Sequence, residues 1–421
     1  MSSPAIVGAV YVMSNQDTGN SVTVFNRAAD GSLTRAGTFP TGGLGAGNSI
    51  SAQNDPLNSQ GALTRSADGR FLFAVDAGSN EVSVLAIKGE TLEPVDRVPS
   101  GGILPNSVTI HDNLLYVVNR GDATVAGFSV ANDGKLSSLG SPTPLGDTKA
   151  TPAQVSFTPG GTQLVVTERR TGVIDVFAVD RDGHVGPPRK NTSSGPQPFG
   201  FTFAGEDLLI VSELGDAAAS SYRIAPDGTL TVVSGSVSTS EQGACWVVTN
   251  SVIDPRFAYV SNSVSGTISG YNINTDGTLS LLTADGHSAM HPDAHAALDS
   301  AVSSDGRFLY ISTAGFSELS DLAGACNKMT ISAFKIGADG SLDSLPSFGT
   351  ADNDPGVPVG LAPGSQGIVA VCLTHNARPC PWAPREEPKD QHFVNLDPHS
   401  KVAMTHDPSS CPRKAEKLRT F

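Results

Sequence analysis

The sequence predicts an all-β fold: a seven-bladed β-propeller with four-stranded antiparallel blades. Two observations support this prediction. A hairpin-sized unit recurs seven times, at intervals of about 45 to 63 residues, which is the range of propeller blades. No run shows the 3.6-residue apolar period that helical repeats require. Because a four-stranded blade leaves its edges unprotected, seven of them are expected to close into a ring.

The repeat unit is clearest between Ser66 and Ile87. Residues 71–76 and 81–87 are β-rich runs too short for helices, and the turn-forming residues 77–80 separate them, so we expect a hairpin. Runs similar to the first strand of this hairpin occur six more times along the chain. They are residues 9–15, 114–119, 164–168, 208–213, 257–262 and 308–313.

A turn containing glycine closes most units. It reads Asp-Gly-x-Leu or Asp-Gly-x-Val in six of them, beginning at Asp30, Asp133, Asp182, Asp227, Asp276 and Asp339. The second unit is degenerate here, with Lys88-Gly. Residues 360–371 supply a last apolar strand, which we expect to pair with residues 9–15, so that N- and C-terminal strands close the ring in one blade.

We therefore assign residues 1–372 to the propeller. Residues 373–421 are rich in Pro, Cys, His and mixed charge and show no packing period, so we expect an irregular, disordered tail. Two long connections, residues 34–60 and 313–328, interrupt the repeats. Long loops on a rigid scaffold are where binding surfaces usually develop.

Composition limits the partners and the compartment. The 421-residue chain carries a net charge of −14 with a pI near 5.0, which argues against nucleic acid and anionic membrane surfaces. No run approaches the roughly 18 to 20 apolar residues of a membrane span. The N-terminus has no basic region before Arg27, so no signal peptide is evident and we expect a cytoplasmic protein. The five cysteines imply no disulfide framework.

The repeat geometry places two circles of side chains at one mouth of the ring. One circle is formed by the last residues of the second strands: Asn15, Asp76, Asn119, Glu168, Glu213, Asn262 and Thr313. The other is formed by the residues that start the innermost strands: Gln60, Ser107, Gln154, Gln197, Trp246 and His295. We take Asn119, Gln154, Gln197 and Trp246 as candidate substrate contacts.

Glu168 and Glu213 are unexpected members of the first circle. Asn and Asp after a strand are often turn formers that bond the local backbone, but Glu is a poor turn residue and is depleted in strands. Two carboxylates at equivalent places in adjacent blades could leave an acid beside a base. A solvated rim without chemistry is the alternative. Arg169 and Arg170 offer positive charge on the same rim for an anionic ligand.

Histidine and cysteine clusters are weaker candidates. His287, His291 and His295 are spaced by four residues near Asp293, but Gly286 and Pro292 disfavour the helix that would align them. Cys372, His375 and Cys380 match no familiar zinc spacing. We predict neither a metal nor a cofactor, and we expect His295 to serve alone as a general base or ligand contact.

The repeats also carry a family resemblance. The chain resembles the lactonase family of seven-bladed β-propellers. The similarity lies in the Ser-x-Asp-Gly-Arg-Phe-Leu motif, in the Asp-Gly-x-Leu turns and in segments 58–62, 75–80 and 194–200. That family includes 6-phosphogluconolactonase-type proteins and carboxymuconate cyclases. The resemblance covers roughly residues 8–371.

The resemblance implies a set of site residues. It implies a glutamate at the end of a second strand, which Glu213 matches, and an arginine at the start of an innermost strand, where Gln197 stands. It also implies a histidine one blade earlier, where Gln154 stands. A cation would then have to come from Arg169, Arg170 or His295.

Two classes of function follow. The first is a cofactor-independent lactonase or lactonising cycloisomerase for a small acidic lactone or muconate-type substrate, with Glu213, His295 and Glu168 as the catalytic candidates. The second is a non-catalytic propeller that binds a small ligand or a protein on its polar mouth. A cation close to Glu213 at the mouth would favour the enzyme.

Overall fold

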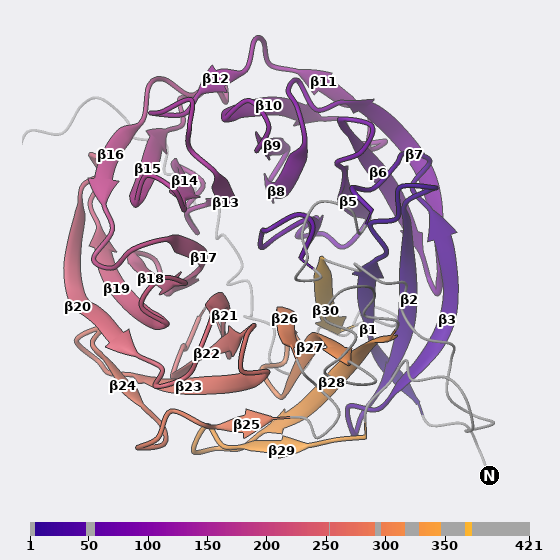
Figure 1. Ribbon diagram of the computed structural model, residues 1–421. Helices are drawn as coiled ribbons and strands as arrows, with labels where there is room; N and C mark the ends of the chain where they lie inside the picture. Colours follow the sequence, from indigo (N-terminus) through magenta and orange to yellow (C-terminus); the bar gives the residue numbers. More distant parts are fainter. Residues whose placement is uncertain are drawn as a thin grey trace, which may run out of the picture. The chain divides into compact units, whose positions relative to one another are not determined.

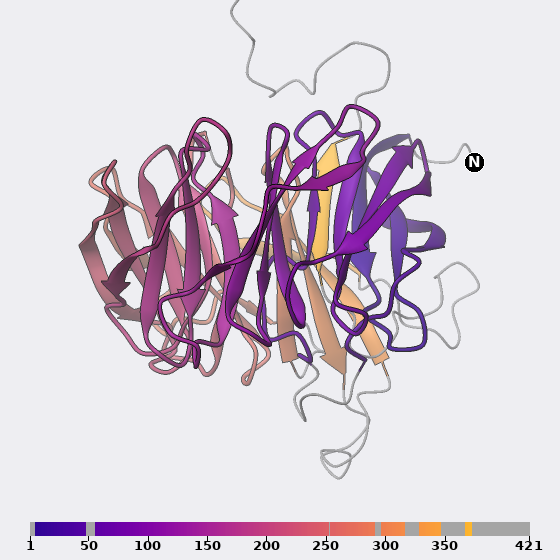
Figure 2. The ribbon, with the colours of Figure 1, turned by 90° about the horizontal axis from the view of Figure 1, so that it is seen from above.

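The computed structural model confirms the seven-bladed β-propeller (Figure 1). It describes residues 5–47, 55–251, 253–290, 296–315, 328–346 and 367–372, and the expected tail at 373–421 lies outside these ranges. The described residues contain no helix, and therefore none that could cross a membrane. Figure 2 shows the ring edge-on, with the turns gathered at its two faces.

Each blade is an antiparallel sheet of four strands, ordered from the channel outward. The innermost strands are β30 (Ile368–Cys372), β4 (Leu63–Arg65), β8 (Pro105–His111), β13 (Pro152–Phe157), β17 (Pro198–Ala204), β21 (Ala244–Thr249) and β26 (Ala296–Val302). The second strands are β1 (Ile6–Met13), β5 (Phe71–Asp76), β9 (Leu114–Asn119), β14 (Gln163–Glu168), β18 (Leu208–Glu213), β22 (Phe257–Asn262) and β27 (Phe308–Gly315). We number the blades 1 to 7 in this order.

The outer half of each blade continues the meander. The third strands are β2 (Ser21–Ala28), β6 (Glu81–Lys88), β10 (Thr124–Val130), β15 (Val173–Ala178), β19 (Ala218–Ile224), β23 (Thr267–Ile273) and β28 (Lys328–Ile336). The outermost strands are β3 (Leu33–Pro40), β7 (Thr91–Pro99), β11 (Leu136–Ser138), β16 (Arg189–Thr192), β20 (Leu230–Ser238), β24 (Leu279–Leu281) and β29 (Leu342–Ser344). Short strands β12 (Thr143–Pro144) and β25 (Ala289–Met290) extend blades 3 and 6.

The two ends of the described chain close the ring in one blade, as predicted. Strand β30 pairs with β1, with Ala370 opposite Val10, and β30 also contacts β4 and β26 of the neighbouring blades. Of the expected strand at 360–371, residues 360–366 lie outside the described ranges. Closure leaves no innermost strand without a neighbour on either side.

The Asp-Gly turns link neighbouring blades through hydrogen bonds. Glycines of the Asp-Gly turns, such as Gly31 and Gly183, have φ near 90° and 82°, a region that favours glycine. Their carbonyl groups accept hydrogen bonds from second-strand tyrosines of the preceding blade. Tyr116 donates to Gly183 at 2.7 Å and Tyr310 donates to Gly31 at 2.9 Å. These tyrosines therefore link neighbouring blades to each other.

Candidate functional site

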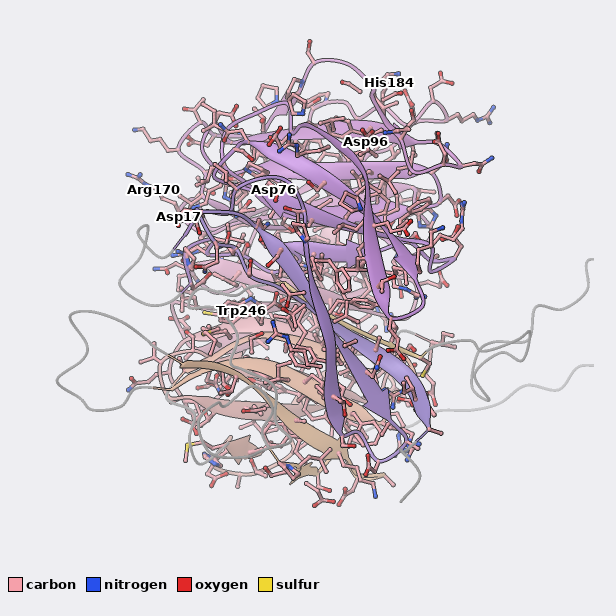
Figure 3. The ribbon with its side chains drawn as sticks, turned by 90° about the vertical axis from the view of Figure 1, so that its right-hand side faces the viewer. Asp17, Asp76, Asp96, Arg170, His184 and Trp246 are labelled. Carbon is pink, nitrogen blue, oxygen red and sulfur yellow. The ribbon has the colours of Figure 1, made fainter. Side chains whose placement is uncertain are left out.

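The second-strand ends and the innermost-strand starts meet at one mouth, as the repeat geometry predicts. Pro152 pairs with Glu168 and Pro198 pairs with Glu213, so the two circles are adjacent. In Figure 3 Arg170 and Trp246 lie toward one side of the ring, and His184, from an Asp-Gly turn, lies toward the other. The mouth with the strand ends is therefore opposite the face with the Asp-Gly turns.

The alternative interpretation of Glu168 and Glu213 as part of a solvated rim is wrong, because the strand-end side chains are buried. All seven of these residues are at most 3% exposed. Most of their side chains bond to the third strand of their own blade or to the loop that covers it. Asn262, for example, donates to Thr267 and Ser269 at 3.1 and 2.9 Å. Asn119 donates to Thr124 at 3.3 Å and to the carbonyl of Ser100 at 3.4 Å.

Glu213 is enclosed by hydrogen-bond donors. Its Oε1 accepts from the Gly195 N–H at 2.8 Å and from the Ser220 hydroxyl at 2.6 Å, and its Oε2 accepts from the Ser236 hydroxyl at 2.7 Å. Segment 194–197 covers it so closely that a Cβ atom at Gly195 would overlap the carboxylate. Glu213 is fully buried and does not open onto the mouth, and its catalytic role stays a prediction.

Glu168 occupies the equivalent position in blade 4 but faces another acid. Its carboxyl group hydrogen-bonds to that of Asp175, the residue seven positions later, where blade 5 has Ser220. Burial and, to a smaller extent, the contact with Asp175 together raise the pKa of Glu168 to about 8, against the lowering effect of the Thr171 hydroxyl. Burial also raises the pKa of Asp175. Glu168 Oε1 and Asp175 Oδ1 have no other hydrogen-bond partner among the described residues, and two carboxyl groups can share a hydrogen bond only if one is protonated, so we expect the pair to hold one proton.

Arg120 and Arg169 are the half-buried cations that the structure brings to this mouth. They follow the last residues of β9 and β14, and their backbone N–H groups bond to the carbonyls of Leu104 and Thr151, at 2.9 and 3.1 Å. Both side chains are half-buried. Burial lowers the pKa of Arg120, the charge of Arg169 lowers it further, and the charge of Asp55 acts in the opposite direction. Among the described residues neither guanidinium forms an ion pair.

Both arginines rest on a segment that crosses the channel, residues 57–60. Arg169 Nη1 donates to Asn58 Oδ1, and its guanidinium lies 5.4 Å from the centre of the Phe199 ring. Arg120 Nη1 reaches the carbonyl of Leu57 at 3.5 Å. The sequence placed Gln60 at the mouth but did not indicate that the segment crosses the channel, because it belongs to the long connection that precedes β4.

Of the four remaining residues predicted to contact substrate, two are buried and two are exposed. Gln154 is buried and its Oε1 accepts from the Phe201 N–H at 2.6 Å. Trp246 is fully buried and donates from Nε1 to the carbonyl of Ser59 at 2.8 Å. Gln197 is exposed, with φ of 56°, and Arg170 is exposed on the same mouth. Only Gln197 and Arg170 of these four can meet a ligand from solvent.

Sequence reasoning missed several buried acids, among them Asp55, Asp175 and Asp299. Asp299 of β26 accepts from the Gly367 N–H at 3.0 Å and from the Ser300 N–H at 2.9 Å. Burial raises its pKa to about 7 despite these donors. A single Asp within an innermost strand is the one signal that could have indicated it.

The histidine and cysteine candidates are only partly described. His287 Nδ1 lies 3.1 Å from Glu241, and Cys372 Sγ accepts from Arg27 Nη2 at 3.1 Å. Within the described ranges no three potential metal ligands gather. His291, Asp293, His295, His375 and Cys380 lie outside those ranges.

Comparisons with known proteins agree with the fold. A family model described as lactonase, 7-bladed beta-propeller, matches residues 8–149 and 208–355. No curated protein matches the sequence.

Solved structures share the architecture at low identity. A protein from Lactobacillus plantarum is 18% identical, with a TM-score of 0.65 over 88% of this chain and 100% of its own. A putative 6-phosphogluconolactonase from Bacteroides fragilis is 17% identical, with a TM-score of 0.61 over 89% and 100%. The periplasmic gluconolactonase of Pseudomonas aeruginosa is 16% identical, with a TM-score of 0.63 over 86% and 99%.

Proposed function

This chain belongs to the lactonase family of seven-bladed β-propellers, and from that premise we propose that it opens or closes the ring of a small acidic lactone at the mouth that holds Arg120 and Arg169. The partner we propose is accordingly a small anionic molecule, of the sugar-acid or muconate type. The proposal needs no cofactor.

One observation carries the proposal: two half-buried guanidinium groups lie at equivalent positions of adjacent blades, and Asp55 is the one described carboxylate whose charge acts on Arg120. Guanidinium groups bind carboxylates through paired charge-assisted hydrogen bonds. A partly desolvated pair also stabilises the oxyanion that forms when water adds to a lactone carbonyl. One arginine can therefore hold the substrate carboxylate while the other faces the reacting carbonyl.

Proton transfer is the second requirement of the reaction. We propose Glu213 and His295 for it, and Glu168 beside Arg169 as the third candidate. Glu213 now accepts from Gly195, Ser220 and Ser236, so its action requires segment 194–197 to move away. His295 directly precedes β26 in the chain.

A non-catalytic binding propeller is the second candidate function. It is favoured by Gln154 and Gln197, which stand where the family resemblance implies a histidine and an arginine. Gln154 is committed to the Phe201 N–H, and Gln197 carries no charge that could stabilise an oxyanion. In this case the arginines bind an anion without turning it over.

The test is hydrolysis of a panel of lactones that differ only in a carboxylate. Arg120→Gln and Arg169→Gln should each raise KM for acidic lactones by roughly 10- to 100-fold, because a charge-assisted hydrogen bond contributes about 1.5–3 kcal/mol. Neutral lactones should be affected much less. Arg70→Gln, on the opposite face and paired with Asp68, is the matched control and should behave as the unmodified protein.

Equal losses on acidic and neutral lactones would contradict the assignment of the arginines to carboxylate binding. Saturable binding of the same lactones without any turnover would support the binding propeller instead.

A further inference from the structure

At three junctions between blades, neighbouring innermost strands are joined by a side chain at one equivalent position. At this position Ser107 Oγ accepts from the Val155 N–H of the next blade at 3.1 Å. Gln154 Oε1 accepts from the Phe201 N–H at 2.6 Å, and Asp299 Oδ2 accepts from the Gly367 N–H at 3.0 Å. In each case the donor belongs to the innermost strand of the following blade or directly precedes it.

The junction between blades 5 and 6 breaks this pattern. Register places Gly200, and not Gln197 as the sequence predicted, at the position of Ser107 and Gln154, so blade 5 offers no side chain to the Val247 N–H. That N–H instead donates to Gln60 Oε1 at 3.0 Å, and Gln60 Nε2 donates back to the Val247 carbonyl at 2.9 Å. A Cβ atom at Gly200 would overlap Gln60 Oε1, so the glycine leaves room for the amide.

Gln60 reaches this junction from the opposite part of the ring. It precedes β4 of blade 2, and its segment crosses the channel in Figure 1. The segment is held on the way by blades 3, 4 and 6. The Gln60 N–H donates to Ala153 at 3.0 Å, and its carbonyl accepts from Ser107 Oγ at 2.7 Å. Trp246 donates to Ser59 at 2.8 Å.

We propose that residues 57–60 are a fixed plug across the channel, and that Gln60 anchors it by supplying the hydrogen-bonding group that blade 5 lacks at Gly200. Gln60 is then a positioning residue. The plug is the floor on which the guanidinium groups of Arg120 and Arg169 rest, so a ligand enters and leaves through this mouth alone. The positioning role rests on the proposed function, whereas the junction itself does not.

The anchoring is tested first by a double-mutant cycle on thermal stability. Gln60→Ala leaves the Val247 N–H and carbonyl without partners and should lower Tm by roughly 2–5 °C. Gly200→Ser introduces an overlap with Gln60 and should lower Tm as well. The double variant should be more stable than the sum of the two losses allows, because the introduced serine hydroxyl would then take the role that Ser107 has in blade 3. Additive losses would overturn the anchoring.

The positioning role is tested by titrating citrate, a small tricarboxylate, into the same variants. We expect Gln60→Ala and the double variant to bind citrate about tenfold more weakly, although the double variant regains stability. Gln163→Ala is the matched control: it removes a buried glutamine that bonds to Ala225 and Pro226 on the other face, and it should lower Tm without changing citrate affinity.

Three outcomes separate the claims. Full recovery of citrate affinity in the double variant would reject positioning and leave Gln60 a purely structural residue. Absence of citrate binding by the unmodified protein would reject both the anion site and the positioning role, while the stability cycle would still decide the anchoring. A double variant that regains stability but still binds citrate more weakly would support both the anchoring and the positioning role of Gln60.

Discussion

Glu168 and Glu213 occupy the same position in neighbouring blades and have opposite surroundings. Each ends a second strand and is almost fully buried. Glu213 accepts from two hydroxyl groups and one backbone N–H. Glu168 accepts from the Thr171 hydroxyl at 2.5 Å and meets the carboxyl group of Asp175.

The difference comes from one residue of the third strand. In blade 5 the residue seven positions after the glutamate is Ser220, which can donate to a carboxylate. In blade 4 it is Asp175, which can donate only if protonated. Position in the fold therefore fixes where a carboxyl group lies, and its partner decides whether it holds a proton. The predictions below separate these two contributions.

The largest expected effect is the loss of Glu213. Glu213→Ala leaves three buried donors without an acceptor, and we expect it to lower the free energy of unfolding by roughly 3–5 kcal/mol. Urea unfolding monitored by tryptophan fluorescence measures this change. Glu206→Ala, which removes an exposed glutamate of the same blade, should change stability by less than about 0.5 kcal/mol.

A Glu213→Ala variant as stable as the Glu206→Ala control would contradict the structural role of this carboxylate. The side chain would then have to point to solvent, which would make the catalytic prediction stronger.

The second effect is the part of the pH dependence of stability that arises from the acid pair of blade 4. The pKa of Glu168 is about 8 in the folded protein, above its ordinary value of 4.5, so the folded state holds more protons between these values. The contribution to stability is complete below pH 4.5 and is lost as pH rises through 8. Asp175→Ser, which copies blade 5, should remove a fall of about 1–3 kcal/mol between pH 5 and 9.

The measurement is the urea midpoint of both proteins at several pH values. Asp299, whose folded pKa is also raised, contributes a fall of the same sign to both proteins and cancels in the difference. Asp343→Ser, at an exposed position of β29, is the control and should keep the fall. Parallel curves for the unmodified protein and Asp175→Ser would show that no proton is shared.

The architecture could be predicted from the sequence because each blade repeats the same strand pattern and the same turn residues. The second strands at 71–76 and 208–213 have the predicted bounds, and the Asp-Gly turns reappear with positive φ at their glycines. Such signals are local, since strand pattern and turn chemistry depend on neighbouring residues. The ring follows from repetition and from the need to pair strand edges.

The site could be predicted only in part. Its mouth and Arg169 followed from strand order, but the burial of Glu213 depends on segment 194–197 and on Ser236 of the outermost strand. The floor depends on Gln60, which bonds to Val247 across the channel. These contacts join residues 18 to 187 positions apart and have no period, so no local pattern indicates them.

The smallest expected effect concerns Lys190, an exposed residue of β16 whose charge lowers the pKa of both Glu168 and Asp175. Lys190→Gln removes this charge, so the pH at which stability falls should move upward. The shift should be only a few tenths of a pH unit, because water and salt screen an exposed ammonium group. Raising NaCl to about 0.5 M should move the unmodified protein in the same direction and leave Lys190→Gln nearly unchanged. A downward shift, or an equal response of both proteins to salt, would mean that Lys190 does not act on the pair, and the difference from Glu213 would then rest on Asp175 alone.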